Sequence, residues 1–204
     1  MKTNSNSYTI IYSAVIVVIV AFLLAFVYQA LKPMQDANVA LDQKKQILNS
    51  LNIRDLSNEA SEAKYKEVVL GEQAVDGNTY YDCKVDGKHL VVIPMKGMGL
   101  WGGISGYVSV DDAAVVYGAY FNHEGETAGL GAEIKDNADW QKKFQGKHLF
   151  KSGSDAVALS VVKKIDDPQT QVDAVTGATL TSNGVSEMLQ KEITKYKSLF
   201  NQSK

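Results

Sequence analysis

The segment that most constrains this chain lies near its N-terminus. Residues 8–31 run for 24 positions without a charged side chain, and Lys2 and Lys32 stand on either side of them. Because a helix needs roughly 20 apolar residues to cross a lipid bilayer, we expect residues 8–31 to form one transmembrane helix. Residues 1–7 are then a short N-terminal tail.

A cleaved signal peptide is the competing interpretation of this segment. Such peptides have an apolar core of about 7 to 15 residues and end in a small-x-small cleavage site. The apolar run is longer here, and the bulky Tyr28 takes the place of a small residue before Ala30. We therefore expect a retained anchor, with Tyr8, Tyr12 and Tyr28 near the two membrane interfaces.

Charge and cysteine content narrow the possible functions. The net charge of −2 and the pI near 5.9 give no basic footprint, so we expect no nucleic-acid partner. A single cysteine, Cys83, excludes an internal disulfide and gives no evidence about the redox compartment. The positive-inside rule sets Lys2 against Lys32, Lys44 and Lys45, and taken alone this count favours a cytoplasmic domain.

The rest of the chain combines helix and strand patterns. Apolar residues at helical spacing between 37 and 51 predict a helix, and residues 32–56 are expected to link the anchor to the domain. Ser57 or Asn58 is placed to cap a second helix over residues 57–67.

Strand patterns fill the middle of the chain. We expect strands at 79–85, 89–95, 106–110, 114–121 and 155–165, and further helices at 136–147 and about 182–200. The Asp86-Gly87 pair between the first two strands is typical of a two-residue hairpin. Strands grouped between helices indicate an α+β domain with an antiparallel sheet, extending over residues 57–204.

A glycine-rich segment after residue 96 matches a nucleotide-binding pattern. Residues 97–102, GMGLWG, fit G-x-G-x-x-G and follow an apolar strand. A dinucleotide fingerprint must open a helix, whereas a second strand follows here, so we reject the Rossmann interpretation. Two interpretations of Trp101 stay open: it is buried in the core, or it borders a site where glycines let the backbone approach a flat ligand.

A second glycine cluster, EGETAGLG, covers residues 124–131. From spacing alone it is a flexible turn, and the neighbouring His123 is more typical of an exposed strand end than of a catalyst. Among the histidines and the cysteine, no spacing indicates a metal site, and we expect none.

The last motif, DAVTGATLTS at 173–182, places four hydroxyl side chains before the C-terminal helix. The first turn of a helix has unpaired N–H groups and partial positive charge, which favour a phosphate there. Gly177 would let the backbone approach that phosphate. Thr181 or Ser182 is expected to cap the helix, and Thr176 to brace the glycine turn.

Residues 173–179, DAVTGAT, resemble the D-x-x-[S/T]-G-A-T flavinylation motif of FMN-binding domains. In that family the last threonine carries FMN through a phosphoester with its 5′-phosphate, installed from FAD by a Mg²⁺-dependent flavin transferase. The resemblance implies covalent attachment at Thr179. Asp173 is expected to hold backbone N–H groups or to position Mg²⁺ during attachment. The other cofactor contacts implied within the motif are Thr176, Gly177, Ala178, Thr181 and Ser182.

The resemblance extends along nearly the whole chain. The segments NSYTIIYSAVIVVIVAFLLAF, KKQILNSLNI, KGMGLWGGISGYV, GETAGLGAEI and TGATLTSNGV are similar to the C subunits of the Na⁺-translocating NADH:quinone oxidoreductases. In that family the G-L-G loop packs against the isoalloxazine ring, which implies a contact from Leu130 with Thr127, Gly129 and Gly131 as loop neighbours. Ala128 stands where the family usually has proline.

The resemblance implies a membrane-anchored electron carrier that holds one covalent FMN and acts as a redox subunit of a six-subunit translocating complex. Its implied partners are the other subunits of the complex and the flavin transferase. It also implies a cytoplasmic N-terminus and a flavin domain on the periplasmic side of the bacterial inner membrane, against the lysine count. Sodium translocation is expected elsewhere, because residues 8–31 contain no ionisable carboxylate or lysine.

Two alternatives stay open. The G subunits of the Rnf electron-transport complexes share the G-L-G and [S/T]-G-A-T elements and the same flavin linkage, but fit the N-terminal segment less well. A non-redox binding module would use residues 176–179 only as a helix cap and the glycines only as turns.

Overall fold

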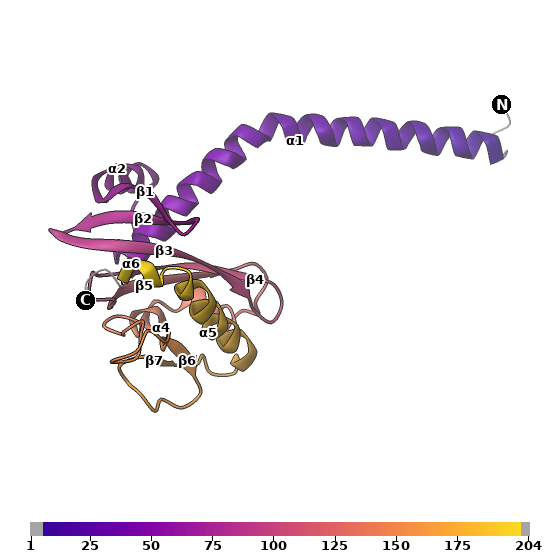
Figure 1. The fold of residues 1–204 in the computed structure, drawn as a ribbon. Coiled ribbons are helices and arrows are strands. Elements are labelled where there is room, and N and C mark those ends of the chain that lie inside the picture. The colour runs from indigo at the N-terminus through magenta and orange to yellow at the C-terminus, as the bar shows by residue number, and fades with distance from the viewer. Residues whose placement is uncertain (1–5, 201–204) are drawn as a thin grey trace. The chain divides into compact units, whose positions relative to one another are not determined.

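The computed structural model describes residues 6–200, so most of the expected N-terminal tail, with Lys2, and the last four residues of the expected domain lie outside it. The described chain contains helices and strands in the order expected of an α+β protein (Figure 1). The helices are α1 (Asn6–Ser50), α2 (Asn58–Val68), α3 (Glu133–Asp136), α4 (Ala138–Lys142), α5 (Thr179–Thr194) and α6 (Lys197–Phe200). The strands are β1 (Val69–Val75), β2 (Asn78–Val85), β3 (Lys88–Met98), β4 (Gly103–Val110), β5 (Val116–His123), β6 (Ser160–Val162) and β7 (Gln171–Asp173).

The described residues divide into two compact units after Asp42. The first unit is the N-terminal part of α1, a helix long and apolar enough to cross a membrane by length and composition. Its apolar side chains are exposed, and Pro33 lies inside the helix. The expected anchor and the helical part of the expected linker are therefore one continuous helix.

The second unit begins at Gln43, inside the segment expected to be a linker. The end of α1 belongs to this unit, because Ile47, Leu48 and Leu51 are almost completely buried in it. Ser57 caps α2 as expected, since its hydroxyl oxygen accepts a hydrogen bond from the Ala60 N–H.

Five antiparallel strands form a sheet in the order β1-β2-β3-β4-β5, so each strand lies beside its neighbour in the chain. The hairpin at Asp86-Gly87 is confirmed, with φ of 50° and 81° at its two central residues. Type I′ turns require positive φ at both positions, which Asp-Gly pairs tolerate. Asp76-Gly77 forms the same kind of turn between β1 and β2, and β1 was not predicted.

Both faces of the sheet are covered, which explains why residues 90–95 of β3 are continuously apolar. Val91, Ile93 and Met95 belong to the larger core, together with α5 and the aromatic rings of α4 and its neighbours. Leu90 and Val92 point to the opposite face, where they join the end of α1 and α2. Successive side chains of a strand point to opposite faces, so alternate residues of β3 enter the two cores.

Two predicted elements are much shorter than expected. In residues 136–147 only α4 is a regular helix beyond the end of α3, although Trp140 and Phe144 do pack together, with ring centroids 5.2 Å apart. In residues 155–165 only β6 is a strand, and it pairs in parallel with the unpredicted β7. The residues between α4 and β6 follow loops, although Phe144, Leu149 and Leu159 among them are fully buried in the core.

The C-terminal helix begins earlier and ends earlier than predicted. α5 starts at Thr179, three residues before the expected position, and stops at Thr194, after which α6 forms a separate short turn. Its buried stripe includes Val185, Met188 and Leu189. α5 lies against β3 on one side and β6 on the other (Figure 1), so its first turn is held at a fixed place beside the sheet.

Candidate functional site

Three segments that are far apart in the sequence meet around a cavity of about 380 Å³. They are the β3–β4 hairpin loop, the glycine-rich loop that follows β5, and the start of α5. The lining residues are Leu100, Trp101, Glu126, Thr127, Leu130, Gly131, Gly177, Ala178, Thr179, Leu180 and Thr181. The structure therefore brings eight residues of the expected site together: Trp101, Thr127, Leu130, Gly131, Gly177, Ala178, Thr179 and Thr181.

Thr179 is the first residue of α5 and is exposed beside this cavity. The N-cap residue before it is Ala178, which provides no side-chain hydrogen bond to the helix start. The first N–H groups of a helix have no partner within the helix, and they carry its partial positive charge. The hydroxyl of Thr179 is thus accessible at a helix end that favours an anion.

The expectation that Thr181 or Ser182 caps α5 is wrong. Both residues lie inside the first turn, and both are 1% exposed. Thr181 Oγ1 donates a hydrogen bond to Glu126 Oε2 at 2.5 Å, and Ser182 Oγ accepts one from the Val175 N–H at 3.1 Å. Because the helix starts earlier than predicted, these hydroxyls point into the domain and attach the helix start to the preceding loops.

Gly177 has both of the properties that favour glycine at a close approach. Its φ is +77°, a conformation that side chains disfavour, and an added Cβ would lie 2.8 Å from Leu130 Cδ2. The turn before Thr179 and the loop that carries Leu130 are therefore in close contact. Leu130 is 43% exposed, so it also offers an apolar surface to the cavity.

The loop after β5 is closed by its own backbone. The N–H groups of Leu130 and Ala132 both donate to the Thr127 carbonyl, each at 3.1 Å. His123 also has a structural role here, because its Nδ1 accepts a hydrogen bond from the Glu126 N–H at 3.2 Å. The loop is thus an ordered turn, and Ala128, which stands where the family usually has proline, is exposed on it.

Trp101 does not belong to the core, since its side chain is 69% exposed. The glycines around it form a four-residue hairpin loop, in which the Gly99 N–H donates to the Gly102 carbonyl at 2.8 Å. The loop presents Trp101 and Leu100 to the cavity. Of the two interpretations left open for Trp101, the structure favours the border of a ligand site.

The remaining expected residues lie next to the cavity and not in it. Gly129, Asp173 and Thr176 line a neighbouring pocket of about 330 Å³. The carboxylate of Asp173 accepts a hydrogen bond from Lys143 Nζ at 2.8 Å, and within residues 6–200 no backbone N–H donates to it. The expected contact with backbone N–H groups is therefore not present, because a lysine from the α4 region takes that place.

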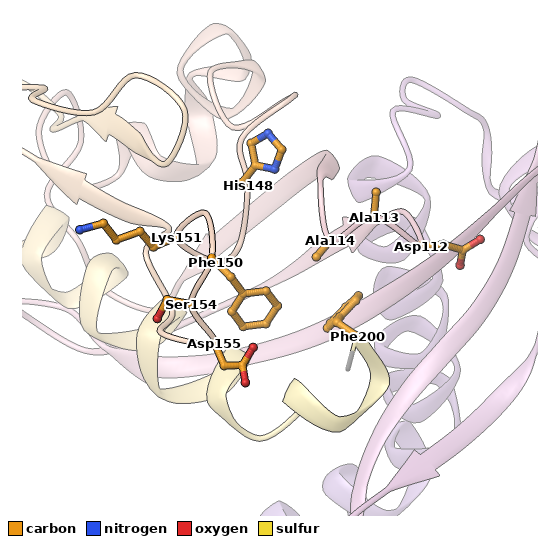
Figure 2. A pocket seen from close by; sticks show the side chains of 10 residues that line it. Asp112, Ala113, Ala114, His148, Phe150, Lys151, Ser154, Asp155 and Phe200 are labelled. Carbon is orange, nitrogen blue, oxygen red and sulfur yellow. The ribbon is translucent and has the colours of Figure 1, made fainter. Parts of the chain in front are cut away.

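A third cavity, of about 240 Å³, has none of the expected site residues in its lining, and Figure 2 shows its walls. Its walls include Asp112, His148 and Lys151, together with the rings of Phe150 and Phe200, whose centroids are 5.8 Å apart. Neither a helix start nor any of the motif threonines borders this cavity, so it does not fit an attached phosphate ester.

The thiol of Cys83 is not an alternative attachment group to the Thr179 hydroxyl. It is fully buried in the smaller core, and burial, reinforced by Asp82, raises the pKa of its thiol to about 12.

Sequence reasoning missed three cavity residues, Leu100, Glu126 and Leu180. Each of them stands within or beside a recognised motif, but the motif does not show which way these side chains point, in the loops or in the first turn of α5.

The described residues fit a flavin phosphate at this cavity. Apolar side chains that soluble proteins normally bury are exposed around it: Leu100, Trp101, Leu130 and Leu180 are between 43% and 69% exposed. Gly177 lets the attachment turn approach the Leu130 side chain closely, and an accessible hydroxyl stands at the positive end of a helix. An aromatic ring system with a phosphate tail matches this combination.

Comparison with known proteins agrees with the geometry. Residues 99–194 match the family described as FMN-binding domain. The C subunit of the Na⁺-translocating NADH-quinone reductase from Haemophilus ducreyi is 43% identical over 133 residues, which cover 64% of this chain and 47% of that protein. The same subunit from Neisseria meningitidis serogroup A is 42% identical over 135 residues, with the same coverage. The chain thus spans about half the length of these curated relatives.

Solved structures extend the likeness to most of the chain. The crystal structure of the C subunit of the Na⁺-translocating NADH-quinone reductase from Parabacteroides distasonis superimposes with a TM-score of 0.77 at 34% identity, covering 85% of this chain and 98% of that one. The α+β fold with an antiparallel sheet and flanking helices is therefore confirmed. The chain belongs to the family formed by the C subunits of the Na⁺-translocating NADH-quinone reductases.

Proposed function

We propose that this protein is a membrane-anchored electron carrier that holds one FMN covalently, through a phosphoester with Thr179. The observation that supports it most directly is the position of Thr179, exposed at the first residue of α5 and on the wall of a cavity with apolar sides. A phosphate on this hydroxyl would meet the unpaired N–H groups of the helix start.

The other walls of the cavity have separate tasks in this proposal. Leu130 and Leu180 offer exposed apolar side chains to a flat ring, and Trp101 covers it from the hairpin loop. Gly177 leaves the room that the attachment turn needs beside Leu130. FMN, when bound, supplies the electron-accepting ring, and a tether through phosphate leaves that ring unmodified.

The anchor and the partners are part of the same proposal. Residues 8–31 would hold the chain in the bacterial inner membrane as a single span, residues 32–56 would connect it, and residues 57–204 would form the FMN-binding domain on the periplasmic side. The relatives named above support membership in a Na⁺-translocating NADH:quinone reductase, so the electron donor and acceptor would be neighbouring subunits. This identity is favoured over membership in an Rnf-type complex because the relatives named above carry the reductase name.

Intact-mass spectrometry of the full chain tests the proposal. The protein is purified from membranes after coexpression with a flavin transferase, which would transfer FMN from FAD to the threonine oxygen and release AMP. We expect a mass gain equal to one FMN less one water. An unmodified, colourless chain would contradict the electron-carrier function.

Substitutions then locate the bond. Thr179→Ala should abolish the mass gain and the in-gel flavin fluorescence, and Thr179→Ser should keep a measurable part of both. Thr176→Ala is the matched control, because Thr176 is also exposed and belongs to the same turn, and it should retain flavin at least in part. Covalent flavin that persists in Thr179→Ala would show that another hydroxyl carries it.

A further inference from the structure

Glu126 is a buried carboxylate that connects all three walls of the cavity. It stands in the loop after β5 and is 7% exposed. Its Oε1 accepts a hydrogen bond from the Trp101 N–H at 2.9 Å, in the hairpin loop, and its Oε2 accepts one from Thr181 Oγ1 at 2.5 Å, in the first turn of α5. The two oxygens of one side chain thus join the hairpin loop to the helix that begins at Thr179.

Two glycines leave the space that this carboxylate fills. A Cβ added to Gly99 would overlap Glu126 Oε1, and a Cβ added to Gly131 would overlap Oε2 and lie 2.6 Å from Thr181 Oγ1. Both glycines have ordinary negative-φ backbone, so conformational freedom does not explain them. The space they leave is occupied by the carboxylate, which is therefore closely packed in one position.

The carboxylate is held in its ionised form. Burial raises the pKa of Glu126, but the hydrogen bond from Thr181 and those from the backbone N–H groups of Trp101 and Leu100, with His123 nearby, lower it more, so that it lies below its usual value. Hydrogen bonds to the charged form stabilise that form. A fixed negative charge consequently lies in the wall of the cavity at neutral pH.

We propose that Glu126 is a positioning residue of the flavin site, which fixes the hairpin loop against the start of α5 and places a negative charge that lowers the reduction potential of the bound flavin. This inference rests on the proposed function. Reduction adds an electron to the ring, and a nearby negative charge opposes that addition more strongly in a partly buried site than in water. Glu126 does not itself exchange electrons or protons with the flavin.

The test compares flavin potentials in the full-length, flavinylated chain. Glu126→Gln removes the charge and can keep both hydrogen bonds, because the amide oxygen can accept from the Trp101 N–H and the amide nitrogen can donate to Thr181 Oγ1. We expect unchanged flavin incorporation and a shift of the one-electron equilibrium toward the reduced form on the order of tenfold, which corresponds to about 59 mV upward. Glu124→Gln is the matched control, since Glu124 is exposed two residues earlier in the same loop, and its shift should be much smaller.

The outcomes separate this inference from the proposed function. If the wild-type chain carries flavin but Glu126→Gln has the same potential as Glu124→Gln, or loses its flavin, the inference is overturned and the proposed function stands. If Glu126→Gln does not fold, as judged by circular dichroism, Thr181→Val decides, because it keeps the charge and removes one hydrogen bond. A potential that does not rise in Thr181→Val supports the role of charge, whereas a rise of about tenfold in the same equilibrium assigns the effect to packing and overturns it.

Discussion

Gly177 and Leu130 lie so close together that a methyl group on the glycine would stand 2.8 Å from Leu130 Cδ2. Gly177→Ala should therefore lower the stability of the unmodified domain by about 1 to 2 kcal/mol, because alanine also disfavours a φ of +77°. Flavin incorporation should fall with it, since Thr179 is only two residues away. Thermal unfolding and intact mass give the two readouts.

Two further variants separate the two causes of the stability loss in Gly177→Ala, which are the contact with Leu130 and the backbone strain. Leu130→Ala combined with Gly177→Ala removes the contact and leaves the backbone strain, so part of the lost stability should return. Gly125→Ala is the control in the neighbouring loop, because its Cβ would meet only the Trp101 carbonyl oxygen at 3.8 Å. Equal losses in Gly125→Ala and Gly177→Ala would contradict the interpretation.

The contact between α5 and the β3–β4 hairpin depends on Gly184. A Cβ at this position would overlap the Met98 carbonyl oxygen and lie 3.4 Å from Gly99 Cα, so helix and hairpin backbones are in direct contact. Gly184→Ala should destabilise the domain by about 1 to 3 kcal/mol, although alanine is the better helix former. Asn183→Ala, at the exposed neighbouring position, should be neutral or slightly stabilising in the same chemical denaturation experiment.

Substitution of the two tryptophans should change the stability of the domain by very different amounts. Trp101 is 69% exposed, so Trp101→Ala should change the stability of the unmodified domain by less than about 0.5 kcal/mol. It should increase the access of a soluble quencher to the flavin. Trp140 is 4% exposed and packs against Phe121 and Phe144, and Trp140→Ala should cost about 3 to 5 kcal/mol. A large loss of stability in Trp101→Ala would mean that its ring is buried in solution.

His89 makes stability depend on pH. Its Nδ1 lies 2.6 Å from Asp112 Oδ1 and its Nε2 lies 2.9 Å from Asp82 Oδ1. The hydrogen bond with Asp112 is the largest influence, and with Asp82 it outweighs partial burial, so the pKa of His89 is raised. A raised folded pKa means that the stabilisation is complete below the unfolded pKa of roughly 6.5 and is lost as pH rises through the folded pKa.

The size of this pH effect is small, because all three side chains are partly exposed. We expect less than about 1 kcal/mol between pH values of about 5.5 and about 8.5. Asp112→Asn should remove most of the difference in melting temperature, and added salt should reduce it in the wild type. Glu187→Gln, which removes an exposed carboxylate of α5, should leave the difference as it is.

Local signals in the sequence predicted strands β2 to β5 of the sheet, but they did not predict β1 or β7. Asp86-Gly87 and the alternating strands beside it were sufficient for β2 and β3, since turn type and pleat are set by near neighbours. The same pair at Asp76-Gly77 was present, but the sequence of β1, VLGEQAV, does not alternate, and as an edge strand β1 has no fully buried residue. A strand was predicted around β6, but it is shorter than expected, and β7, which pairs with β6, was not predicted because no alternating pattern marks its three residues.

The sequence motifs predicted which segments form the candidate site, but not which way their side chains point. Thr179 and Leu130 were identified through the resemblance to FMN-binding domains, and Gly177 through the close backbone approach that glycine allows. The capping assignment of Thr181 failed, since the start of α5 is set by packing of the whole helix and the hydroxyl found a partner 55 residues away in sequence. Glu126 was overlooked for the same reason, because its two partners lie in other segments.

The exposure of Thr179 also bears on the order in which this protein matures. The hydroxyl lies on the surface of the domain, and the helix that carries it packs into the core along a buried stripe that does not include Thr179. The proposed attachment of FMN to Thr179 would therefore need no unfolding, and it would be able to follow both membrane insertion and folding. Under the proposed function, a folded but colourless chain would wait in the membrane until the flavin transferase reaches it.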